Sequence, residues 1–426
     1  MKGPASKLKR ATLAALGTFA LAGTGPALAY EGSSWLQFGP TPGGPPSYGS
    51  SSYDRTFIRE WEANPPKGYP TLAVANIEAT KVAIKRYQEI VKSGGWKALP
   101  EQQLQSGATS PAVGILRERL LMSGDLRDDS SSPDYFDHYL EKAVKRFQAS
   151  NGLTPTGIVD KRTIGALNVP AAARLRQLTN GLARLQEHAR SAPRKYVLVN
   201  IPAAQVEAVE DGRIVSRHSG VVGKIDRPTP VLRSQIHELN FNPVWRLPPT
   251  VVFKDLIPKG KEMQRAGKNV LVKYNIDAYD GSGRKLDPEK INWSSGQPAG
   301  LAYSQQPGKD NPLGFLKINF HNGHSVYMHD TPSETIFGRN FRAASSGCIR
   351  VQGIESLAAW LLADQGWSEA GVQDIKKSGE RKDVKLKKPV PLYFVYITAW
   401  ATEDGVVQFR RDLYQRDGVG ATASAY

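Results

Sequence analysis

Cys348 and His329 are the residues of this chain best suited to nucleophilic chemistry. Cys348 is the only cysteine among 426 residues, follows Ser345-Ser346-Gly347, and lies nineteen positions after His329. A thiolate is a strong nucleophile, and a nearby base or positive charge is needed to form it at neutral pH. A glycine before the cysteine lets a carbonyl group approach the backbone, so that the N–H groups of Gly347 and Cys348 can stabilise a developing oxyanion. Spacing alone leaves open a buried structural cysteine beside an unrelated histidine.

A β-hairpin is predicted to position His329. Residues 315–320 and 325–330 flank the segment His321-Asn322-Gly323-His324, and Asn-Gly is the strongest signal for a two-residue turn. Such a turn places Leu316 opposite His329, with His321 and His324 on the other face. The face that carries His329 is then apolar, because period-two alternation adds these residues to it: Leu316, Ile318, Phe320 and Tyr327. His329 is therefore expected to point into a site sheltered from bulk water.

Two short motifs resemble the signature of a known enzyme family. HDTP at residues 329–332 and SSGCIRV at residues 345–351 look like the motifs of the YkuD-type L,D-transpeptidases, cysteine enzymes that cross-link peptidoglycan. The likeness covers nearly everything from residue 76 onward. It is greatest to the large Gram-negative members with a peptidoglycan-binding domain upstream and an inserted capping lobe. The other segments that carry it are VVGKIDRPTP (221–230), FNPVWRLPPT (241–250), PLGFLKINF (312–320) and LLADQGW (361–367).

The resemblance implies a mechanism through a thioester. His329 takes the proton of Cys348 to give a thiolate–imidazolium pair, and the thiolate attacks the carbonyl between the third and fourth residues of a tetrapeptide stem. His329 then protonates the departing D-alanine. The side-chain amine of the third residue of a neighbouring stem takes up the acyl group, which forms a 3-3 cross-link. No cofactor and no metal ion are expected.

The resemblance also suggests roles for residues around the nucleophile. Backbone N–H groups of Gly347 and Cys348 form the oxyanion hole, and Ser346 either adds a hydroxyl donor or only shapes the turn. Many family members have histidine and asparagine where this chain has Ser346 and Arg350. Arg350 either binds a substrate carboxylate, which suits its fork geometry, or pairs with an internal acid. Tyr327 is expected to line the site, with its backbone carbonyl orienting the imidazole.

The expected fold is α+β. An antiparallel β-rich catalytic domain (193–418) contains a capping lobe inserted at 247–305, and a small all-α peptidoglycan-binding-like domain (76–168) precedes it. Within that helical domain, Leu140, Val144 and Phe147 share one helix face, while Ser110-Pro111 and Asp160 are typical helix starts. A connecting helix is predicted at 171–192, after which the pattern changes to period two.

The N-terminus and the composition indicate an exported protein. Residues 1–29 read as a secretory signal peptide, with basic residues, a short apolar run and Ala27-Leu28-Ala29 before the expected cleavage site. Residues 30–70 are rich in Gly, Pro and Ser and are expected to be a linker. We therefore expect a periplasmic, wall-associated protein without stable membrane insertion after cleavage of the signal peptide.

The net charge of +16, or +12 without residues 1–29, suits an anionic partner. The basic residues are dispersed rather than gathered in one stripe, so nucleic acid is not expected. The expected partners are peptidoglycan stem peptides, a tetrapeptide donor and a third-residue amine acceptor.

Several alternatives remain at the level of sequence. Water, a free D-amino acid or a lysine of an outer-membrane protein could accept the acyl group, which would give an L,D-carboxypeptidase, an exchange enzyme or an anchoring enzyme. His321, His324, His329 and Asp330 superficially resemble the ligands of a zinc-dependent peptidoglycan peptidase. The predicted hairpin separates His329 from the other two histidines, which weakens the zinc hypothesis. A non-catalytic wall-binding protein is a further alternative.

Overall fold

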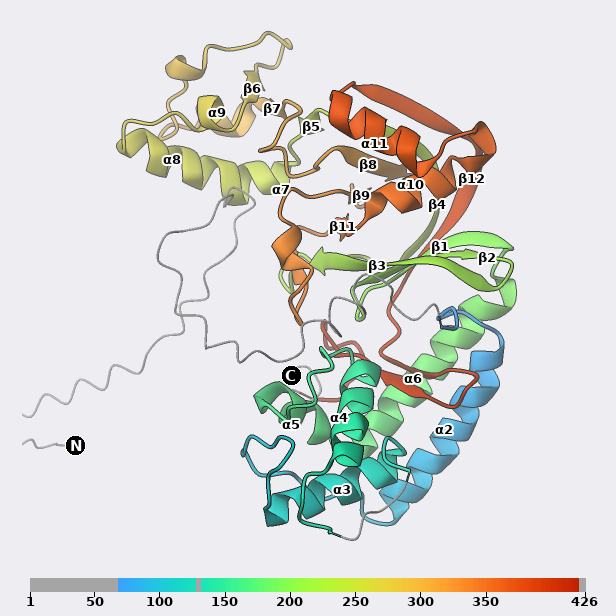
Figure 1. Ribbon diagram of the computed structural model, residues 1–426. Helices are drawn as coiled ribbons and strands as arrows, with labels where there is room; N and C mark the ends of the chain where they lie inside the picture. The colour runs from blue at the N-terminus through green and yellow to red at the C-terminus, as the bar shows by residue number, and fades with distance from the viewer. Residues whose placement is uncertain (1–67, 128–131, 421–426) are drawn as a thin grey trace, which may run out of the picture.

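The computed structural model describes residues 68–127 and 132–420 of the chain. The predicted signal peptide, and the predicted linker up to residue 67, lie outside these ranges. In Figure 1 a helical region lies at the bottom, a twisted β-sheet above it, and a separate lobe at the upper left. No helix within the described ranges is long and apolar enough to cross a bilayer.

Helices make up the first part of the described chain. They are α2 (Ala75–Lys92), α3 (Pro111–Ser123), α4 (His138–Ser150), α5 (Lys161–Leu167) and α6 (Ala171–His188), followed by the 3₁₀ turn Ala189–Ser191. The predicted caps are confirmed, because Ser110 Oγ accepts a hydrogen bond from Ala112 N (3.2 Å) and Asp160 accepts one from Thr163 N (2.8 Å). α2 ends at Lys92, and Gly94 and Gly95 just after it have φ of +92° and +78°, which do not continue a helix.

The apolar side chains of these helices divide into separate clusters. Residues between Leu99 and Leu167 pack among themselves, around α3, α4 and α5. α2 instead packs on α6 and on the hairpin of β13 (Ala399–Ala401) and β14 (Val407–Phe409), through residues such as Tyr87, Leu178 and Phe409. The long helices α2 and α6 are therefore shared with the β-rich domain and join it to the α3–α5 module.

A nine-stranded sheet forms the centre of the β-rich domain, and the predicted α+β class is confirmed. The strand order is β10-β3-β11-β9-β8-β4-β12-β1-β2. Most neighbours are antiparallel, but β1–β12, β10–β3 and β11–β9 are parallel. The strands are β1 (Lys195–Asn200), β2 (Gln205–Glu210), β3 (Arg213–Gly223), β4 (Leu232–Phe241), β8 (Leu316–Phe320), β9 (Met328–His329), β10 (Ala343–Ser345), β11 (Ile349–Val351) and β12 (Lys382–Val395).

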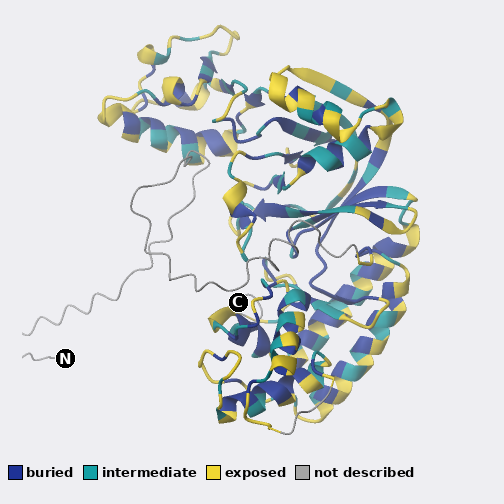
Figure 2. Ribbon diagram, viewed as in Figure 1, coloured by how far each residue is buried: buried dark blue, intermediate teal, exposed yellow. Residues whose placement is uncertain are grey.

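One face of the sheet is covered by α10 (Ile354–Leu361) and α11 (Glu369–Ser378). Ile354, Leu357 and Leu361 of α10 pack against Leu316, Ile318 and Phe320 of β8 in the largest apolar cluster. Figure 2 shows the sheet buried and the outer helix surfaces exposed. The core of the β-rich domain therefore lies on the side of the sheet that carries α10.

The register of the β8–β9 hairpin differs by one residue from the prediction. Lys317, and not Leu316, lies opposite His329, and Ile318 lies opposite Met328. The turn is longer than two residues, because the Asn322 side chain accepts hydrogen bonds from His324 N and Val326 N (3.0 and 3.1 Å). Ser325 adopts a left-handed backbone (φ +55°) that absorbs the additional residue. Since a one-residue slip moves every side chain to the other face, His329 lies on the face opposite to the apolar residues of β8.

The chain between β4 and β8, which includes the range 247–305 predicted as a capping lobe, forms a separate lobe. It contains β5 (Trp245–Arg246), α7 (Pro249–Val251), a π-helix (Val252–Leu256), α8 (Ile257–Arg265), α9 (Val270–Lys273), β6 (Ile276–Tyr279), 3₁₀ turns at Pro288–Lys290 and Gln297–Gly300, and β7 (Ala302–Gln305). β5, β7 and β6 form a three-stranded sheet. An apolar cluster within the lobe, which includes Leu256 and Trp293, extends to Tyr327 at the edge of the main sheet.

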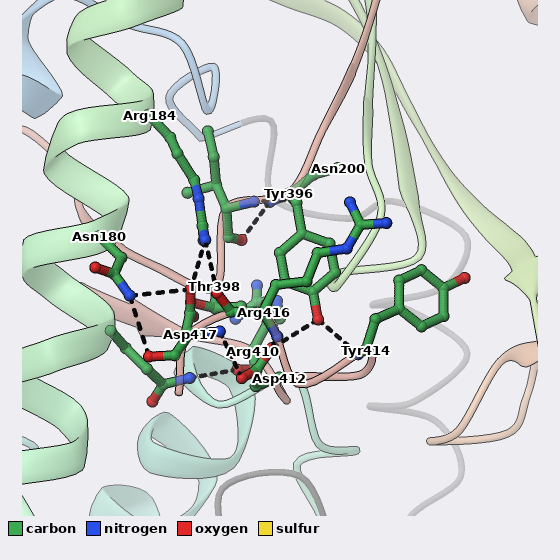
Figure 3. A network of polar contacts seen from close by, with 12 residues as sticks. Asn180, Arg184, Asn200, Tyr396, Thr398, Arg410, Asp412, Tyr414, Arg416 and Asp417 are labelled. Atoms are coloured by element: carbon green, nitrogen blue, oxygen red, sulfur yellow. Dashed lines mark hydrogen bonds and ion pairs between the residues drawn. The ribbon is translucent and has the colours of Figure 1, made fainter. Parts of the chain in front are cut away.

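The C-terminal segment ties α6 to the main sheet through buried carboxylates (Figure 3). Asp417 accepts from Arg184 of α6 (2.7 Å), and Asp412 accepts from the hydroxyl of Tyr396 (2.7 Å). The same Asp412 accepts from the backbone N–H groups of residues 416 and 417 (both 2.9 Å). Tyr414 N donates to the Tyr396 hydroxyl (2.7 Å). Buried carboxylates with this many partners are well compensated, so the segment is held rigidly.

Candidate active site

The paired strands β8, β9 and β11 bring the candidate residues to one face of the sheet. Arg350 lies opposite His329 in the parallel pair β11–β9, and Ile349 N donates to Tyr327 O (3.0 Å). Continuing this register places Cys348 beside Tyr327. Because paired residues point to the same face and alternate residues share it, Cys348, Arg350, Tyr327 and His329 project together. Cys348 and His329 are diagonal neighbours on this face.

Lys317 completes this face and was not predicted from the sequence as a site residue. It lies opposite His329 on β8, and its ammonium group sits 4.6 Å from the centre of the Tyr327 ring. The predicted register had placed it on the other side of the hairpin. The signal that could have revealed it is the Asn322 side chain, which favours a longer turn by offering its own acceptor to the backbone.

The turn before the nucleophile is held by hydrogen bonds from several segments. Gly347 has φ +114°, which only glycine adopts without strain. Gly347 N donates to Ser345 Oγ (3.1 Å), and Ser345 Oγ donates to Cys348 O (2.6 Å). The predicted use of the Gly347 N–H in an oxyanion hole is thus not supported, since Ser345 occupies that donor. Of the two predicted donors, the Cys348 N–H remains.

The loop after β3 also holds this turn in place through hydrogen bonds. Thr229 Oγ1 donates to Gly347 O and accepts from Gly223 N, both at 2.9 Å. Thr229 N donates to the hydroxyl of Tyr414 (3.1 Å), which in turn donates to Gly223 O (2.7 Å). The rigid C-terminal segment of Figure 3 therefore extends, through Tyr414 and Thr229, to the residue before Cys348.

His329 is oriented by the backbone that follows it. It is 5% exposed, and its Nδ1 lies 2.6 Å from Asp330 O. A carbonyl can only accept, so Nδ1 carries the proton and Nε2 is left as the basic nitrogen. The predicted orientation by the Tyr327 carbonyl is wrong, because Nδ1 bonds to Asp330 O instead, while the Tyr327 carbonyl accepts from Ile349 N. The Asp330 side chain accepts from Phe315 N (3.1 Å), as expected of a turn cap and not of a triad member.

Burial controls the protonation of the site. It raises the pKa of the Cys348 thiol to about 11, although Tyr327, Lys317 and Arg350 act in the opposite direction. Burial, followed by the charges of Arg350 and Lys317, lowers the pKa of His329 to about 3. Burial also raises the pKa of Tyr327 well above its ordinary value. The predicted thiolate–imidazolium pair is therefore not the resting state, in which thiol and imidazole are both neutral.

This electrostatic state predicts the pH dependence of thiol alkylation. A thiol with a pKa near 11 gains thiolate roughly tenfold per pH unit below that value. The rate of iodoacetamide labelling of Cys348 is followed by intact-protein mass spectrometry, with the free thiol of glutathione as the reference. The Cys348 rate should keep rising between pH 8.5 and 9.5, while the labelling rate of glutathione begins to level off. A plateau of the Cys348 rate below pH 8 would instead demonstrate a preformed ion pair.

Arg350 and Tyr327 both bring polar side-chain atoms to this site. Among the ion pairs of the described residues none includes Arg350, and its Nε is buried without a hydrogen-bond partner there. Burial lowers the pKa of Arg350, and the neighbouring Cys348 opposes this. The Tyr327 hydroxyl accepts from Trp245 Nε1 of the lobe (2.7 Å) and hydrogen-bonds to Cys348. Tyr327 thus connects the lobe to the nucleophile.

Ser346 is exposed and contacts the loop after β3. Its Oγ accepts a hydrogen bond from Arg227 Nη1 (2.8 Å), and the same nitrogen lies 2.8 Å from Asp255 Oδ2 of the π-helix in the lobe. The side chains of Arg227 and Asp255 are only 11% and 9% exposed. A buried ion pair thus connects the lobe to the turn that carries Cys348.

The histidines of the hairpin do not converge. His321 stacks on His237, with ring centres 4.1 Å apart, and His324 is exposed. In residues 68–127 and 132–420 there is no group of three or more His, Cys, Asp or Glu side chains that could hold a metal ion. The arrangement can support nucleophilic attack by a thiol on a carbonyl, with an imidazole base and flanking cations.

Comparison with known proteins identifies two domains. Residues 194–390 match the YkuD family, described as the L,D-transpeptidase catalytic domain, and residues 109–167 match a family described as "Putative peptidoglycan binding domain". A Haemophilus influenzae protein named "Putative L,D-transpeptidase" is 32% identical over 221 residues. That match covers 52% of this chain and 44% of the relative, so it spans less than half of the relative's length.

The solved structures that match this chain include two crystal structures of L,D-transpeptidases. The one from Xylanimonas cellulosilytica is 17% identical, with a TM-score of 0.22, and the match covers 70% of this chain and 98% of that one. The one from Stackebrandtia nassauensis is 12% identical, with a TM-score of 0.27 and coverage of 68% and 94%. From the family matches, residues 194–390 are an L,D-transpeptidase catalytic domain of the YkuD family, and a domain of the peptidoglycan-binding family precedes them at residues 109–167.

Proposed function

We propose that this protein is a peptidoglycan L,D-transpeptidase that forms 3-3 cross-links through a thioester on Cys348. The observation that carries the proposal is the shared face on which Cys348, His329, Tyr327 and Arg350 project, beneath the inserted lobe. A periplasmic location and the export signal at residues 1–29 belong to the same proposal. The membership of the catalytic domain in the YkuD family supports the reaction class.

Acylation begins when a carboxylate of the donor stem pairs with Arg350. The new negative charge offsets the cation that depresses the pKa of His329, so Nε2 can accept the Cys348 proton. Sγ then attacks the carbonyl between the third and fourth residues, and the Cys348 N–H stabilises the oxyanion. The Ser346 hydroxyl, whose oxygen already accepts from Arg227, can donate its own proton to the same oxyanion.

Collapse of the tetrahedral intermediate breaks the peptide bond. His329 gives its proton to the departing amine of D-alanine, and the acyl group remains on Sγ as a thioester. The amine of the third residue of a second stem then attacks the thioester, loses a proton to His329 and restores the thiol. Lys317 and Arg350 favour the thiolate as leaving group at this step because both carry positive charge close to Sγ.

The proposed reaction is tested with a purified tetrapeptide donor and an amine acceptor. Intact-protein mass spectrometry should show an adduct of the tripeptide acyl group on Cys348, and chromatography of the products should show 3-3 dimers. Tripeptide alone would identify an L,D-carboxypeptidase, and incorporation of an added D-amino acid would identify an exchange enzyme. Absence of any adduct on Cys348 while products still form would contradict the thioester.

The lobe is proposed to protect the thioester from water. It contacts the site twice, through Trp245 on the Tyr327 hydroxyl and through Asp255 on Arg227, which also binds Ser346. Removing one partner of a buried ion pair leaves an uncompensated buried charge, which strongly destabilises the local structure. Removing the Asp255 charge should therefore loosen the contact between lobe and turn and admit water to the thioester.

Asp255→Asn is expected to raise hydrolysis relative to cross-linking several-fold, while acylation of Cys348 persists. The measurement is the ratio of tripeptide to dimer formed from one donor. Glu262→Gln is the matched control, because it breaks an exposed pair of the same lobe, Lys259–Glu262, whose side chains are 30% and 68% exposed. An equal change of the ratio in both variants, or none in a folded Asp255→Asn protein, would contradict the protective role.

A further inference from the structure

A large cleft separates the helical region from the catalytic domain, away from Cys348. Its volume is about 960 Å³. It is lined by residues of α2, α3 and α4 and, from the other domain, by residues of β3, the loop 337–342 and the β13–β14 hairpin. None of the candidate active-site residues lines it. Such a volume is at the upper end of ligand sites, so it can hold an extended ligand.

The charge of this cleft is strongly one-sided. Among the described residues that line it, eight are arginines, none is a lysine or a glutamate, and the acids are Asp125 and Asp404. One of the eight, Arg217, is paired with the buried Glu207 (3.1 Å). A concentration of one sign in a concave site focuses the electrostatic potential and attracts ions of the opposite sign. Planar guanidinium groups bind carboxylates through two parallel hydrogen bonds, which lysine cannot do.

The arginines come from both domains, and not all are satisfied by the protein. Arg119 of α3 is 2% exposed, stacks 3.6 Å above the Trp96 ring, and its Nη1 lacks a hydrogen-bond partner among the described residues. Arg146 of α4 donates to the Asp125 carbonyl (2.9 and 2.7 Å), its partner among the described residues, and is exposed. Arg339, in the loop that leads from His329 to Cys348, is exposed as well. A buried donor without an acceptor is costly unless a ligand supplies one.

Aromatic side chains lie between these cations. Tyr87 and Phe147 from the helices, and Trp400 and Phe409 from the β13–β14 hairpin, contribute to the wall. These four side chains are only 2–4% exposed, so they support the wall and leave recognition mainly to the cations. An acidic peptide of a few residues matches such a cationic lining, and peptidoglycan stems are such peptides.

We propose that this cleft is a second stem-peptide site, which binds the carboxylates of a stem that is not the one being cross-linked. The inference rests on the proposed function for the identity of the ligand. Recognition is shared by the α3–α5 module and the catalytic domain, because Arg146 comes from the first and Arg339 from the second. The protein thereby holds one strand of the wall while Cys348 acts on another.

The test uses the full chain and two soluble probes, the tetrapeptide stem and the same peptide with its carboxylates amidated. Binding is measured by calorimetry with Cys348→Ala protein, so that no reaction occurs. The double substitution Arg146→Glu with Arg339→Glu is expected to weaken binding of the acidic peptide at least tenfold. The amidated peptide should bind the protein with an intact cleft no more tightly than the acidic peptide binds the double variant. Arg339→Ala, which removes an exposed side chain, should give a smaller loss and guards against misfolding of the double variant.

Arg381→Glu is the control, since it changes the net charge of an exposed site outside the cleft. Equal weakening by Arg381→Glu, unchanged binding in the double variant, or equal binding of the amidated peptide would each overturn the proposal. The acyl adduct on Cys348 is measured separately in the otherwise wild-type cleft variants and should persist. If neither the wild-type protein nor any cleft variant forms the adduct, while binding still depends on Arg146 and Arg339, the proposed function fails. The cleft then remains a binding site for an anionic peptide.

Discussion

Replacement of Cys348 by alanine is expected to abolish acyl-enzyme formation and to lower turnover by on the order of 10⁴-fold or more. Cys348 is the only thiol of the chain, and its place after the Gly347 turn leaves no neighbouring nucleophile in that position. Cys348→Ser should be nearly as inactive, because a hydroxyl in a site that already raises the pKa of a thiol to about 11 is much harder to ionise. The measurement is the rate of dimer formation from a tetrapeptide donor.

The fold of both variants should survive, which distinguishes chemistry from structure. The turn is held by Ser345, Thr229 and the backbone, and none of these contacts uses the sulfur atom. Thermal unfolding should therefore remain close to wild type, within the small cost of removing one partly buried atom. Turnover retained in a folded Cys348→Ala protein would refute the cysteine mechanism.

Replacement of His329 by alanine is expected to lower the acylation rate about 10²- to 10⁴-fold, the usual contribution of general acid–base catalysis. The resting thiol is neutral, so a base must remove its proton during the attack, and His329 Nε2 is the candidate. Because His329 and Cys348 act in the same step, the double variant should be little slower than the slower single variant. The measurement is the rate of adduct formation by mass spectrometry.

His324→Ala is the matched control for His329→Ala. It removes an exposed histidine from the same hairpin, five residues away, and should leave the rate nearly unchanged. Activity should also survive chelators, since the described histidines do not converge. A stoichiometric zinc ion whose removal abolishes activity, together with a large effect of His324→Ala, would favour the zinc peptidase alternative.

Local signals in the sequence were reliable where the cause is local. The caps at Ser110 and Asp160, and the buried face of α4, follow from the preferences of a few neighbouring residues. The hairpin shows where this reasoning fails. Asn322-Gly323 predicted a two-residue turn, but the Asn322 side chain bonds to the backbone two and four residues ahead and allows a longer one. Because strand alternation has a period of two, that single residue reversed the face on which His329 lies.

The electrostatics of the site depended on residues far apart in the chain. The spacing of Cys348 and His329 suggested an ion pair, whereas the folded site holds both groups neutral. Two features decide this, namely burial beneath the lobe and the charges of Lys317 and Arg350. Neither burial nor the approach of Lys317 can be read from spacing, since both arise only when β8, β9 and β11 pair.

The sequence by itself determined the α+β class, because short periodic patterns encode it. It also predicted Cys348 as nucleophile, His329 as base and an inserted lobe, from residue types and motifs. Tertiary structure decided which atoms are available for chemistry. It assigned the Gly347 N–H to Ser345, gave the imidazole its orientation through Asp330 O, and connected the lobe to the turn through Arg227. Hydrogen bonds and charges act over a few ångströms in space, and only the packing of distant segments establishes which groups lie within that range.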